Sequence, residues 1–477
     1  MKFDVCIVGS GAGAGPVIYE LAKAGYKVCV LEKGPFLKTE DFNKDEYLSC
    51  RKDVYASNLK DEFHEIESYS ARKKKWLTET TKESGKSYWN GNMVGGSSNL
   101  MSAYFHRMKP KDFKLLSTYG PIDGANIVDW PISYGDLEPY YTKVESVVGV
   151  SGEVRQHSTQ EPRSTNHFAY PPLKTNIISD WLDKAASEEG YELVPVARGI
   201  ISQPTNNRQG CYYSNFCGSY GCRSNAKSSS RVALINQALE TGNCTIIPMA
   251  KVFHLESNGE HKIKKAWYRH GASKSSIEAA VFVVAAQAIE TARLLLASKN
   301  TDYPNGLGNT TNQVGKNLIF SAGGIGGGYL EYERFSGDEV QKLKQPGLWV
   351  NRAIQHWYEI EDQAFGGKLK GGTVDFVFEH ANPLPKLNRL KWEGSRFIFG
   401  DELKAKIHNY FTQQRKIKFE IFNDWLPTDK CFVTLSNSET DKWGDPVAKV
   451  KIGYHPHDLK VARYLADKGE QLLAKIG

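Results

Sequence analysis

The chain has 477 residues and a net charge of +7, with 40% apolar and 24% charged residues, a composition typical of globular proteins. The length predicts two or three structural units. The longest unbroken apolar run, residues 279–286, is too short to cross a bilayer, so the sequence indicates no integral membrane segment. The densest basic run, residues 72–75, is typical of a solvated surface, and no nucleic-acid-binding module is evident.

The N-terminus has the pattern of a dinucleotide-binding unit. An apolar run with β-branched residues, Phe3–Val8, predicts a buried parallel strand. A glycine-rich turn follows, then a helix that begins near Pro16, and a second strand over Lys27–Leu31 ends at Glu32. The turn has the form G-x-G-x-x-A over residues 9–14. Its position between a strand and a helix is that of a phosphate-binding turn.

Each position of this turn has a physical role. Gly9 allows the tight turn, Gly11 lets the backbone approach a diphosphate, and Ala14 lets the helix pack against the strand. The helix N-terminus offers free N–H groups to the diphosphate. Glu32, 23 residues after Gly9, can accept both ribose hydroxyls, which favours FAD or NAD over NADP. The glycine-rich run over residues 323–328 lacks this context, and we interpret it as a bent strand.

Five ordered blocks resemble the glucose–methanol–choline (GMC) family of FAD oxidoreductases. They are YWNGNMVGGSSN over residues 88–99 with Arg107 and Asp112-Phe113; DWPI and LEPYY over 129–132 and 137–141; AAQAIET and RLL over 285–291 and 293–295; Gly308-Asn309; and VGKNL over 314–318. The resemblance extends from residue 3 to about residue 460. It implies an α/β fold with a Rossmann-like FAD-binding domain and an antiparallel-sheet substrate domain.

The resemblance also implies a further set of cofactor-binding residues. These are Gly95, Gly96, Ser97, Ser98, Asn99, Val252, Ala285 and Ala286. The Gly-Gly-Ser-Ser run offers a close backbone and hydroxyl donors to a phosphate or a flavin edge, and residues 281–286 are expected to form a buried strand that ends beside the cofactor. The family usually has glycine where Gln287 stands, so we expect a different local backbone or flavin contact there.

Three of the eight cysteines, Cys211, Cys217 and Cys222, lie within twelve residues in a loop rich in Gly, Asn and Ser. Three thiolates suit a three-iron cluster. The segment resembles the insert of bacterial FAD-dependent sugar dehydrogenases, whose catalytic subunits carry a [3Fe-4S] cluster, although the last spacing there is one residue shorter. It also resembles a cysteine stretch of long-chain alcohol oxidases. We predict cluster ligands, with plain thiols or a surface disulfide as the alternatives.

The catalytic base is not assigned by the sequence. In the family, a His of a C-terminal block removes the alcohol proton, with a second His or an Asn nearby. Residues 441–446 resemble the stretch that precedes this block, and the chain ends at Gly477 before the block would be complete. We therefore expect the C-terminal part to be missing; the alternatives are that a partner supplies these residues or that the protein does no such chemistry. His455 and His457 are interpreted as structural loop residues, and His408-Asn409 as part of a surface helix.

The resemblance and the hydrophobic pattern together divide the chain into domains. The FAD-binding domain is expected over residues 1–38, 76–110 and 225–320, with residues 39–75 as a lid or surface excursion. Residues 111–224 form a helical insertion with the cysteine loop, residues 321–457 the substrate-binding sheet domain, and residues 458–477 a helix that leads back to the FAD domain.

These features predict an FAD-dependent dehydrogenase that oxidises a CH–OH group of a sugar or sugar derivative by hydride transfer to the flavin. Electrons would leave through the iron–sulfur cluster to a cytochrome, quinone or dye. An FAD alcohol oxidase that uses oxygen and a non-catalytic flavoprotein or electron-carrier scaffold are the alternatives. The N-terminus lacks a signal-peptide pattern. The resemblance implies a small, signal-bearing partner subunit, so we expect a periplasmic complex, or otherwise a cytoplasmic protein.

Overall fold

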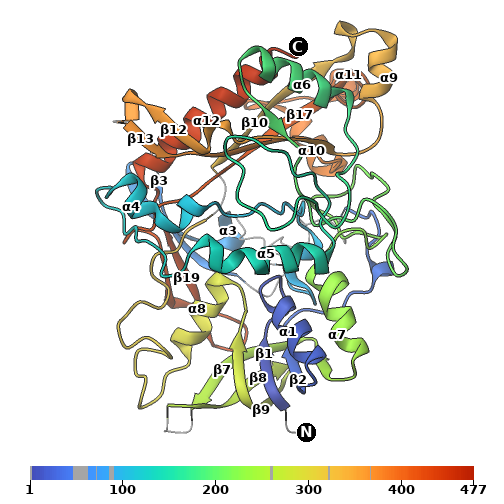
Figure 1. The fold of residues 1–477 in the computed structure, drawn as a ribbon. Helices are drawn as coiled ribbons and strands as arrows, with labels where there is room; N and C mark the ends of the chain where they lie inside the picture. The colour runs from blue at the N-terminus through green and yellow to red at the C-terminus, as the bar shows by residue number, and fades with distance from the viewer. Residues whose placement is uncertain are drawn as a thin grey trace.

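The structure, a computed structural model, describes residues 3–46, 63–70, 72–84, 91–257, 261–320, 323–365 and 367–477. One feature discussed above, the beginning of the second flavin block at residues 88–90, lies outside this part. The N-terminal unit lies at one end of the molecule and the C-terminus at the opposite end (Figure 1).

A six-stranded mixed sheet contains the N-terminal unit, with the order β6-β2-β1-β9-β8-β7. Its strands are β1 (Phe3–Val8), β2 (Val28–Leu31), β6 (Cys244–Ile247), β7 (Ala250–Ser257), β8 (Ile263–His270) and β9 (Ser273–Val284). The first four strands of this order are parallel, and β8 and β7 add antiparallel pairs. α1 (Ala14–Lys23) begins directly after the turn, and its Ile18 and Ala22, one helical turn apart, are buried against β1 and β2.

A five-stranded antiparallel sheet forms the opposite end of the molecule, with the order β10-β17-β14-β11-β5. Its strands are β5 (Leu193–Val194), β10 (Gly324–Glu331), β11 (Trp349–Ile354), β14 (Gly372–Phe378) and β17 (Gln414–Asn423). β17 alternates between buried and partly buried residues, the pattern of a strand with one face against the core. α12 (Pro456–Ala474) packs on β10 and β17, and α6 (Ile177–Glu188) packs on β11. The strand predicted at residues 323–328 appears as β10, and a terminal helix appears as α12. That this helix leads back to the FAD domain stays a prediction.

A third, four-stranded sheet joins two segments that are far apart in the chain. Its order is β18-β19-β3-β4, with β3 (Glu65–Ser70), β4 (Lys75–Thr80), β18 (Phe432–Thr440) and β19 (Pro446–Ile452). α8 (Ala288–Ala297) packs between this sheet and β7, where Ile289 and Ala292 contact Val433 and Val450. Residues 321–457 are therefore shared between two sheets. The division into domains stays a prediction.

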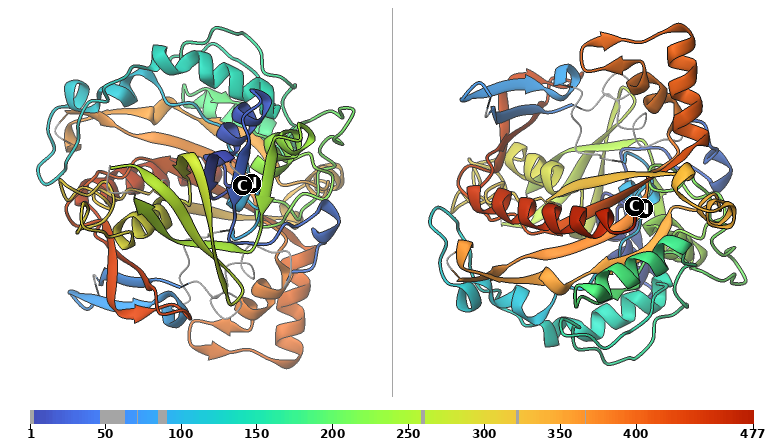
Figure 2. Two further views of the ribbon diagram at one scale, coloured as in Figure 1. Left: turned by 90° about the horizontal axis from the view of Figure 1, so that it is seen from below. Right: turned by 90° about the horizontal axis from the view of Figure 1, so that it is seen from above.

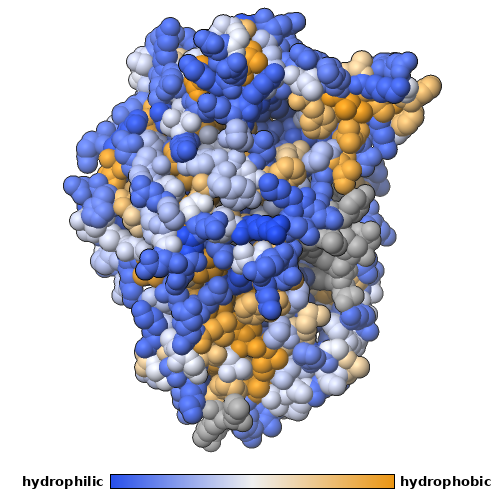
Figure 3. Space-filling model, turned by 90° about the vertical axis from the view of Figure 1, so that its right-hand side faces the viewer, coloured by the Kyte–Doolittle hydropathy of each residue, from blue (hydrophilic) through white to orange (hydrophobic). Residues whose placement is uncertain are grey.

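α5 (Tyr134–Val148) runs across the molecule between the two larger sheets (Figure 1). A projecting arm, residues 383–412, extends from the five-stranded sheet and is visible in Figure 2. It consists of α10 (Pro383–Leu390), β15 (Trp392–Glu393), β16 (Arg396–Phe397) and α11 (Gly400–Thr412). Trp392, Phe397 and Phe399 are exposed on it. Figure 3 shows hydrophobic side chains gathered on a projecting corner of the molecule. α11 contains no buried residue among those described, which confirms the surface helix predicted at His408-Asn409.

The remaining elements are short. They are α3 (Thr81–Ser84), α4 (Leu115–Tyr119), α7 (Asn236–Glu240), α9 (Gly337–Leu343) and the hairpin of β12 (Glu359–Asp362) and β13 (Gly367–Lys370). Within the described ranges, none of the helices combines the length and the apolar character that a membrane span requires.

Candidate functional site

A cavity of about 700 Å³ lies at the carboxyl ends of the parallel strands β1, β2 and β9. This is the edge at which open α/β sheets bind their ligands, and the volume is typical of a cofactor site. Nine of the cofactor-binding residues predicted from the sequence line the cavity: Gly9, Gly11, Glu32, Gly96, Ser97, Ser98, Val252, Ala285 and Ala286. Ala14, Gly95 and Asn99 lie outside its lining.

The glycine turn leaves room for a ligand at the start of α1. A Cβ atom added to Gly11 or Gly13 would have no neighbour within 4 Å in the protein. Among the described residues, α1 has neither a side-chain cap nor an acidic residue in its first turn. The N–H groups of Ala14 and Gly15 donate to the Gly11 carbonyl, and the positive end of the helix dipole lies at the cavity. Such a helix N-terminus favours an anion, and the geometry fits a diphosphate.

A second helix, α8, also begins at the cavity, but its N-terminus is already occupied. The Gln287 Oε1 atom accepts hydrogen bonds from the N–H groups of Ile289 (2.8 Å) and Glu290 (3.4 Å). Gln287 has φ 75° and ψ 156°, a conformation that glycine adopts far more easily than other residues. The backbone therefore keeps the shape that suits the family's usual glycine, while the glutamine side chain caps the helix. The start of α1 is left as the better anion site.

Glu32 is buried at the end of β2 and lines the cavity. Its Oε2 accepts hydrogen bonds from the Ser10 N–H (3.1 Å) and Oγ (2.6 Å), and its Oε1 accepts one from the Gly34 N–H (2.9 Å). Burial raises the pKa of Glu32, although these hydrogen bonds oppose the shift. A carboxylate oxygen can accept more than one hydrogen bond, so both oxygens remain able to accept ribose hydroxyls.

The second flavin block is held as a loop by its own side chains. Gly95 has φ 91°, and its N–H donates to Ser10 Oγ (3.0 Å), which joins this block to the first. Ser97 Oγ accepts from the Gly91 N–H (2.8 Å), and Ser98 Oγ donates to the Gly95 carbonyl (2.5 Å). Asn99 Nδ2 donates to the carbonyls of Val94 and Gly96, both at 3.0 Å. These hydrogen bonds hold the loop in place, and Gly96, Ser97 and Ser98 line the cavity. Hydrogen-bond donation from these residues to a phosphate or a flavin edge stays a prediction.

A buried charge cluster lies where α8 meets the cavity. Glu290 pairs with Arg293 (2.9 Å) and with His64 (3.2 Å). Burial alone would raise the pKa of Glu290, but the charges of Arg293 and Lys33 lower it well below its usual range. Burial lowers the pKa of Lys33 to about 8. Neighbouring charges therefore outweigh burial at Glu290, whereas burial outweighs them at Lys33. Lys33, Glu290 and Arg293 all line the cavity.

The three clustered cysteines pack against the same hydrophobic core and are free thiols. Burial raises the pKa of Cys211 to about 11 and also raises the pKa of Cys217. Lys227 ties the loop to the second flavin block, because its Nζ donates to the carbonyls of Asn99 (3.2 Å) and Cys217 (3.4 Å). Within the part of the chain that the structure describes, no group of three His, Cys, Asp or Glu side chains has an arrangement that could hold a metal ion. The geometry therefore does not support the predicted cluster.

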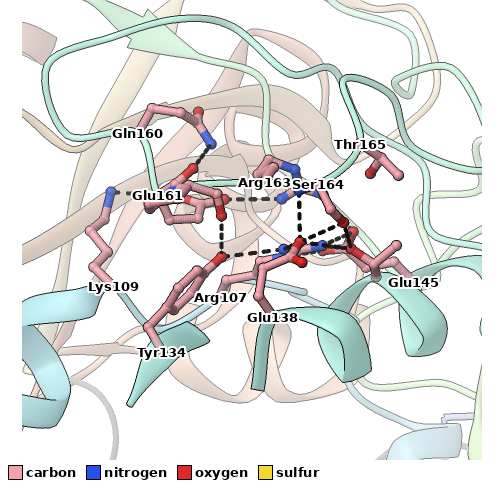
Figure 4. Close-up of polar contacts among 12 residues, drawn as sticks. Arg107, Lys109, Tyr134, Glu138, Glu145, Gln160, Glu161, Arg163, Ser164 and Thr165 are labelled. Carbon is pink, nitrogen blue, oxygen red and sulfur yellow. Dashed lines mark hydrogen bonds and ion pairs between the residues drawn. The ribbon is translucent and has the colours of Figure 1, made fainter. Parts of the chain in front are cut away.

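An ion-pair network braces the segment that follows the second flavin block (Figure 4). Arg107 donates two hydrogen bonds to Glu145 of α5, at 2.7 and 2.8 Å, and one to Glu138, at 3.0 Å. Arg163 also pairs with Glu145, and the side chains of Arg107, Glu145 and Arg163 are at most 4% exposed. Burial alone would lower the pKa of Arg107, but the bonds to Glu145 and its neighbours raise it. The network joins Arg107, and with it the segment after the second flavin block, to α5.

A polar group on the five-stranded sheet was not predicted from the sequence. Asp375 of β14 and Glu420 of β17 are paired in register, so both side chains point from the same face of the sheet. Tyr104, which lines the cavity, donates from its hydroxyl to Glu420 (2.9 Å), and His106 Nε2 lies 3.0 Å from Asp375 Oδ2. The sequence feature that could have indicated this polar group is the single aspartate inside the apolar strand GTVDFVF.

Comparisons with known proteins agree with this geometry. The family model "GMC oxidoreductase" matches residues 74–321. The chain is 25% identical over 481 residues to 2-methyl-1,2-propanediol dehydrogenase of Mycolicibacterium austroafricanum, covering 98% of this chain and 79% of that protein. It is 31% identical over 227 residues to the fructose dehydrogenase large subunit of Gluconobacter japonicus, covering 47% of this chain and 40% of that subunit.

The fold has a counterpart among solved structures. A crystal structure of formate oxidase matches with a TM-score of 0.60 at 15% identity, covering 99% of this chain and 81% of that one. At this identity the match concerns the fold alone, and it confirms the predicted class, a Rossmann-like domain joined to a sheet domain. Fold, cavity and family model agree, and the chain belongs to the GMC oxidoreductases, a family of enzymes that bind FAD and act on CH–OH groups.

Proposed function

We propose that this chain binds FAD in the 700 Å³ cavity and acts as a dehydrogenase on the CH–OH group of a sugar or sugar derivative. The observation that carries the proposal is the position of this cavity. One end meets the uncapped N-terminus of α1 and the carboxylate of Glu32, and Tyr104 connects its wall to the polar face of the five-stranded sheet. FAD, when bound, accepts the hydride of the oxidised carbon.

The chain's own residues would hold the cofactor in three ways. The backbone of the glycine turn over residues 9–13 and the positive end of the α1 dipole hold the diphosphate. Glu32 accepts the ribose hydroxyls. Gly96, Ser97 and Ser98, with Val252, Ala285 and Ala286, form the walls that enclose the rings. The carboxylates of Asp375 and Glu420 give the neighbouring sheet face hydrogen-bond acceptors, which suit a polyhydroxylated substrate.

For the electron acceptor we propose a cytochrome, quinone or dye rather than oxygen, because the two relatives described above are named dehydrogenases. The iron–sulfur cluster at Cys211, Cys217 and Cys222 is not part of this proposal. It stays a prediction of the sequence, and the iron and sulfide content of anaerobically purified protein checks it. Iron-free, folded protein that still oxidises its substrate would dismiss the cluster.

We also propose a partner subunit, since the fructose dehydrogenase relative is named as a large subunit. A periplasmic location through such a partner is the corresponding proposal for localisation. Co-purification from native cells, followed by cell fractionation, tests both. Activity confined to the cytoplasm without any co-purifying subunit would contradict them.

The experiment for the main proposal is anaerobic mixing of FAD-loaded protein with a panel of sugars, sugar acids and simple alcohols. At least one sugar-type substrate should bleach the visible absorbance of the flavin, and a one-electron dye should restore it. Rapid return of the colour with oxygen and release of peroxide would instead identify an alcohol oxidase. A flavin that no member of the panel reduces would contradict the enzyme assignment and favour a non-catalytic flavoprotein.

A further inference from the structure

The projecting arm, residues 383–412, presents three aromatic side chains on one face. Trp392 and Phe397 are paired in register on β15 and β16, so their side chains point to the same side of this hairpin. Phe399 follows Phe397 by two residues in an extended backbone, whereas Ile398 between them is buried. The chain thus alternates here between outward phenylalanines and an inward isoleucine.

The three rings form one continuous surface, which we call the aromatic tip. The ring centroids of Trp392 and Phe397 are 5.1 Å apart, and those of Phe397 and Phe399 are 6.3 Å apart. The exposed fractions are 49% for Trp392, 50% for Phe397 and 73% for Phe399. Contiguous exposed apolar side chains of this kind mark a site of interaction with a protein, a ligand or a membrane.

The base of the arm is firmly attached to the five-stranded sheet. Glu379, directly after β14, forms ion pairs with Lys386 of α10 (3.0 Å) and Lys416 of β17 (3.1 Å), and it accepts the hydroxyl hydrogen of Tyr410 of α11. Burial alone would raise the pKa of Glu379, but the hydrogen bond from Tyr410 and the two lysines lower it to about 2. α11 also packs on β17. Both helices of the arm are therefore fixed, and they support the aromatic tip.

Cationic side chains outnumber acidic ones on the arm. It contains six cationic and three acidic side chains, namely Lys386, Arg389, Lys391, Arg396, Lys404 and Lys406 against Glu393, Asp401 and Glu402. The three acidic side chains already have partners within the arm, since they form ion pairs with Arg396, Lys404 and Lys406. Arg389 and Lys391, just before Trp392 in the sequence, add to the excess of positive charge, and the whole chain also has a net charge of +7.

The combination of aromatic rings with lysines distinguishes between the possible partners. The buried parts of protein interfaces are rich in aromatic residues but depleted in lysine. Segments that bind a membrane surface combine Trp and Phe, which enter the headgroup region, with Lys and Arg, which attract anionic lipids. The arm also projects from the body of the molecule (Figure 2), so its aromatic side chains can enter a headgroup layer ahead of the rest of the protein. Composition and shape favour a lipid surface.

We propose that the projecting arm docks this protein on the surface of an anionic membrane. The aromatic tip lies at the boundary between lipid headgroups and acyl chains, and the cations of the arm face the lipid phosphates. The contact is peripheral, because the helices within the described ranges do not have the length and apolar character of a membrane span. The inference goes beyond the proposed function and does not depend on it, since neither FAD nor a substrate takes part.

Vesicle flotation with the full chain tests the role of the aromatic tip. Wild-type protein should float with vesicles of phosphatidylcholine mixed with phosphatidylglycerol, and less at high salt, because salt screens the attraction to anionic lipids. The triple variant Trp392→Ser, Phe397→Ser and Phe399→Ser should bind about tenfold more weakly or less, since it loses the apolar contact. The matched control, Val128→Ser with Tyr140→Ser, removes exposed apolar side chains outside the arm and should bind like the wild type.

A second pair of variants tests the contribution of charge. Lys391→Gln with Lys404→Gln should weaken binding to the mixed vesicles by about fivefold for each lysine, and binding to vesicles of phosphatidylcholine alone should not change. Lys262→Gln with Lys264→Gln is the matched control, because these exposed lysines lie near β8, in the sheet at the opposite end of the molecule. This control should bind the mixed vesicles like the wild type.

Each outcome supports or overturns the inference. Wild-type protein that does not float with the mixed vesicles, or a folded triple variant that floats like the wild type, would overturn it. If sedimentation shows that the wild type forms a dimer that the triple variant does not form, and vesicles are not bound, the arm is a contact between copies and the lipid assignment is wrong. If the triple variant fails to fold, Phe399→Ser alone replaces it and should also bind the mixed vesicles more weakly than the wild type.

Discussion

Gln287 combines two opposing contributions to stability in one residue. Its backbone conformation, φ 75° and ψ 156°, costs a non-glycine residue roughly 1–3 kcal/mol. Its side chain caps α8 through the N–H groups of Ile289 and Glu290, and a helix cap typically contributes about 1 kcal/mol. The capping hydrogen bonds thus offset part of the backbone strain, which explains how glutamine is tolerated at a glycine-like position.

This balance predicts different effects for two substitutions at the same position. Gln287→Ala loses the cap and keeps the strain, so the free energy of unfolding should fall by about 1 kcal/mol. Gln287→Gly loses the cap but relieves the strain, so it should be at least as stable as the wild type. Urea unfolding of both variants measures the difference. Equal stability of the two variants would show that the backbone at Gln287 is not strained.

Gly9 and Gly11 lie two residues apart but should respond oppositely to a methyl group. At Gly9, φ is +94° and an added Cβ would lie 2.5 Å from the Ala285 carbonyl oxygen. Gly9→Ala should therefore lower the free energy of unfolding by about 2 kcal/mol or more. Gly11→Ala adds a Cβ to open space and should stay within about 0.5 kcal/mol of the wild type. Thermal unfolding of the cofactor-free variants checks this order, and a reversed order would refute it.

At the scale of elements, the ion pairs of Arg107 with Glu138 and Glu145 join α5 to the segment that follows the second flavin block. Glu145→Gln removes the carboxylate that the buried guanidinium groups of Arg107 and Arg163 share and leaves each with one carboxylate partner, so the unfolding free energy should fall by about 3 kcal/mol. The matched control is Glu20→Gln, which removes the exposed pair with Lys143 and should cost under about 1 kcal/mol. Denaturant titrations compare the two variants. Similar losses for both would mean that the buried network does not stabilise α5.

The N-terminus of α12 has a carboxylate that makes stability depend on pH. Asp458 accepts hydrogen bonds from the Leu426 N–H, yet burial raises its pKa from 3.8 to about 6. A group whose pKa is higher in the folded state contributes stability at low pH, and this contribution is lost as the pH rises through about 6. Relative to Asp458→Asn, the wild type should lose up to about 3 kcal/mol between about pH 4 and about pH 7. Urea unfolding across this range measures it, and a pH-independent difference would contradict it.

At the scale of the whole molecule, the sequence predicted those parts of the fold whose signals are local. The strand, glycine turn, helix and second strand of residues 3–31 appear as β1, α1 and β2 within a residue or two of the expected bounds. The sheet of β3, β4, β18 and β19 was not predicted, because β3 and β19 are paired across more than 370 residues. Pairings at such separations depend on tertiary packing rather than on local pattern.

In the candidate site, too, only the features with a local sequence pattern could be predicted. The glycines and Glu32 were identifiable because phosphate-binding turns need particular residues at fixed spacing. His106 and Asp375 are separated by 269 positions, and no spacing rule connects them. The cysteine trio illustrates the reverse case, since closeness in sequence suggested a cluster that the arrangement of the described side chains does not support.

The FAD content of purified wild-type protein and of Gly11→Val, after incubation with excess FAD and gel filtration, tests the cofactor site most directly. The wild-type chain should hold about one FAD. Gly11→Val should hold almost none, because the branched side chain enters the space at the start of α1 where the diphosphate is expected. Circular dichroism should show the same fold in both proteins. A folded Gly11→Val protein that keeps FAD at the wild-type ratio would contradict the assignment of the cavity.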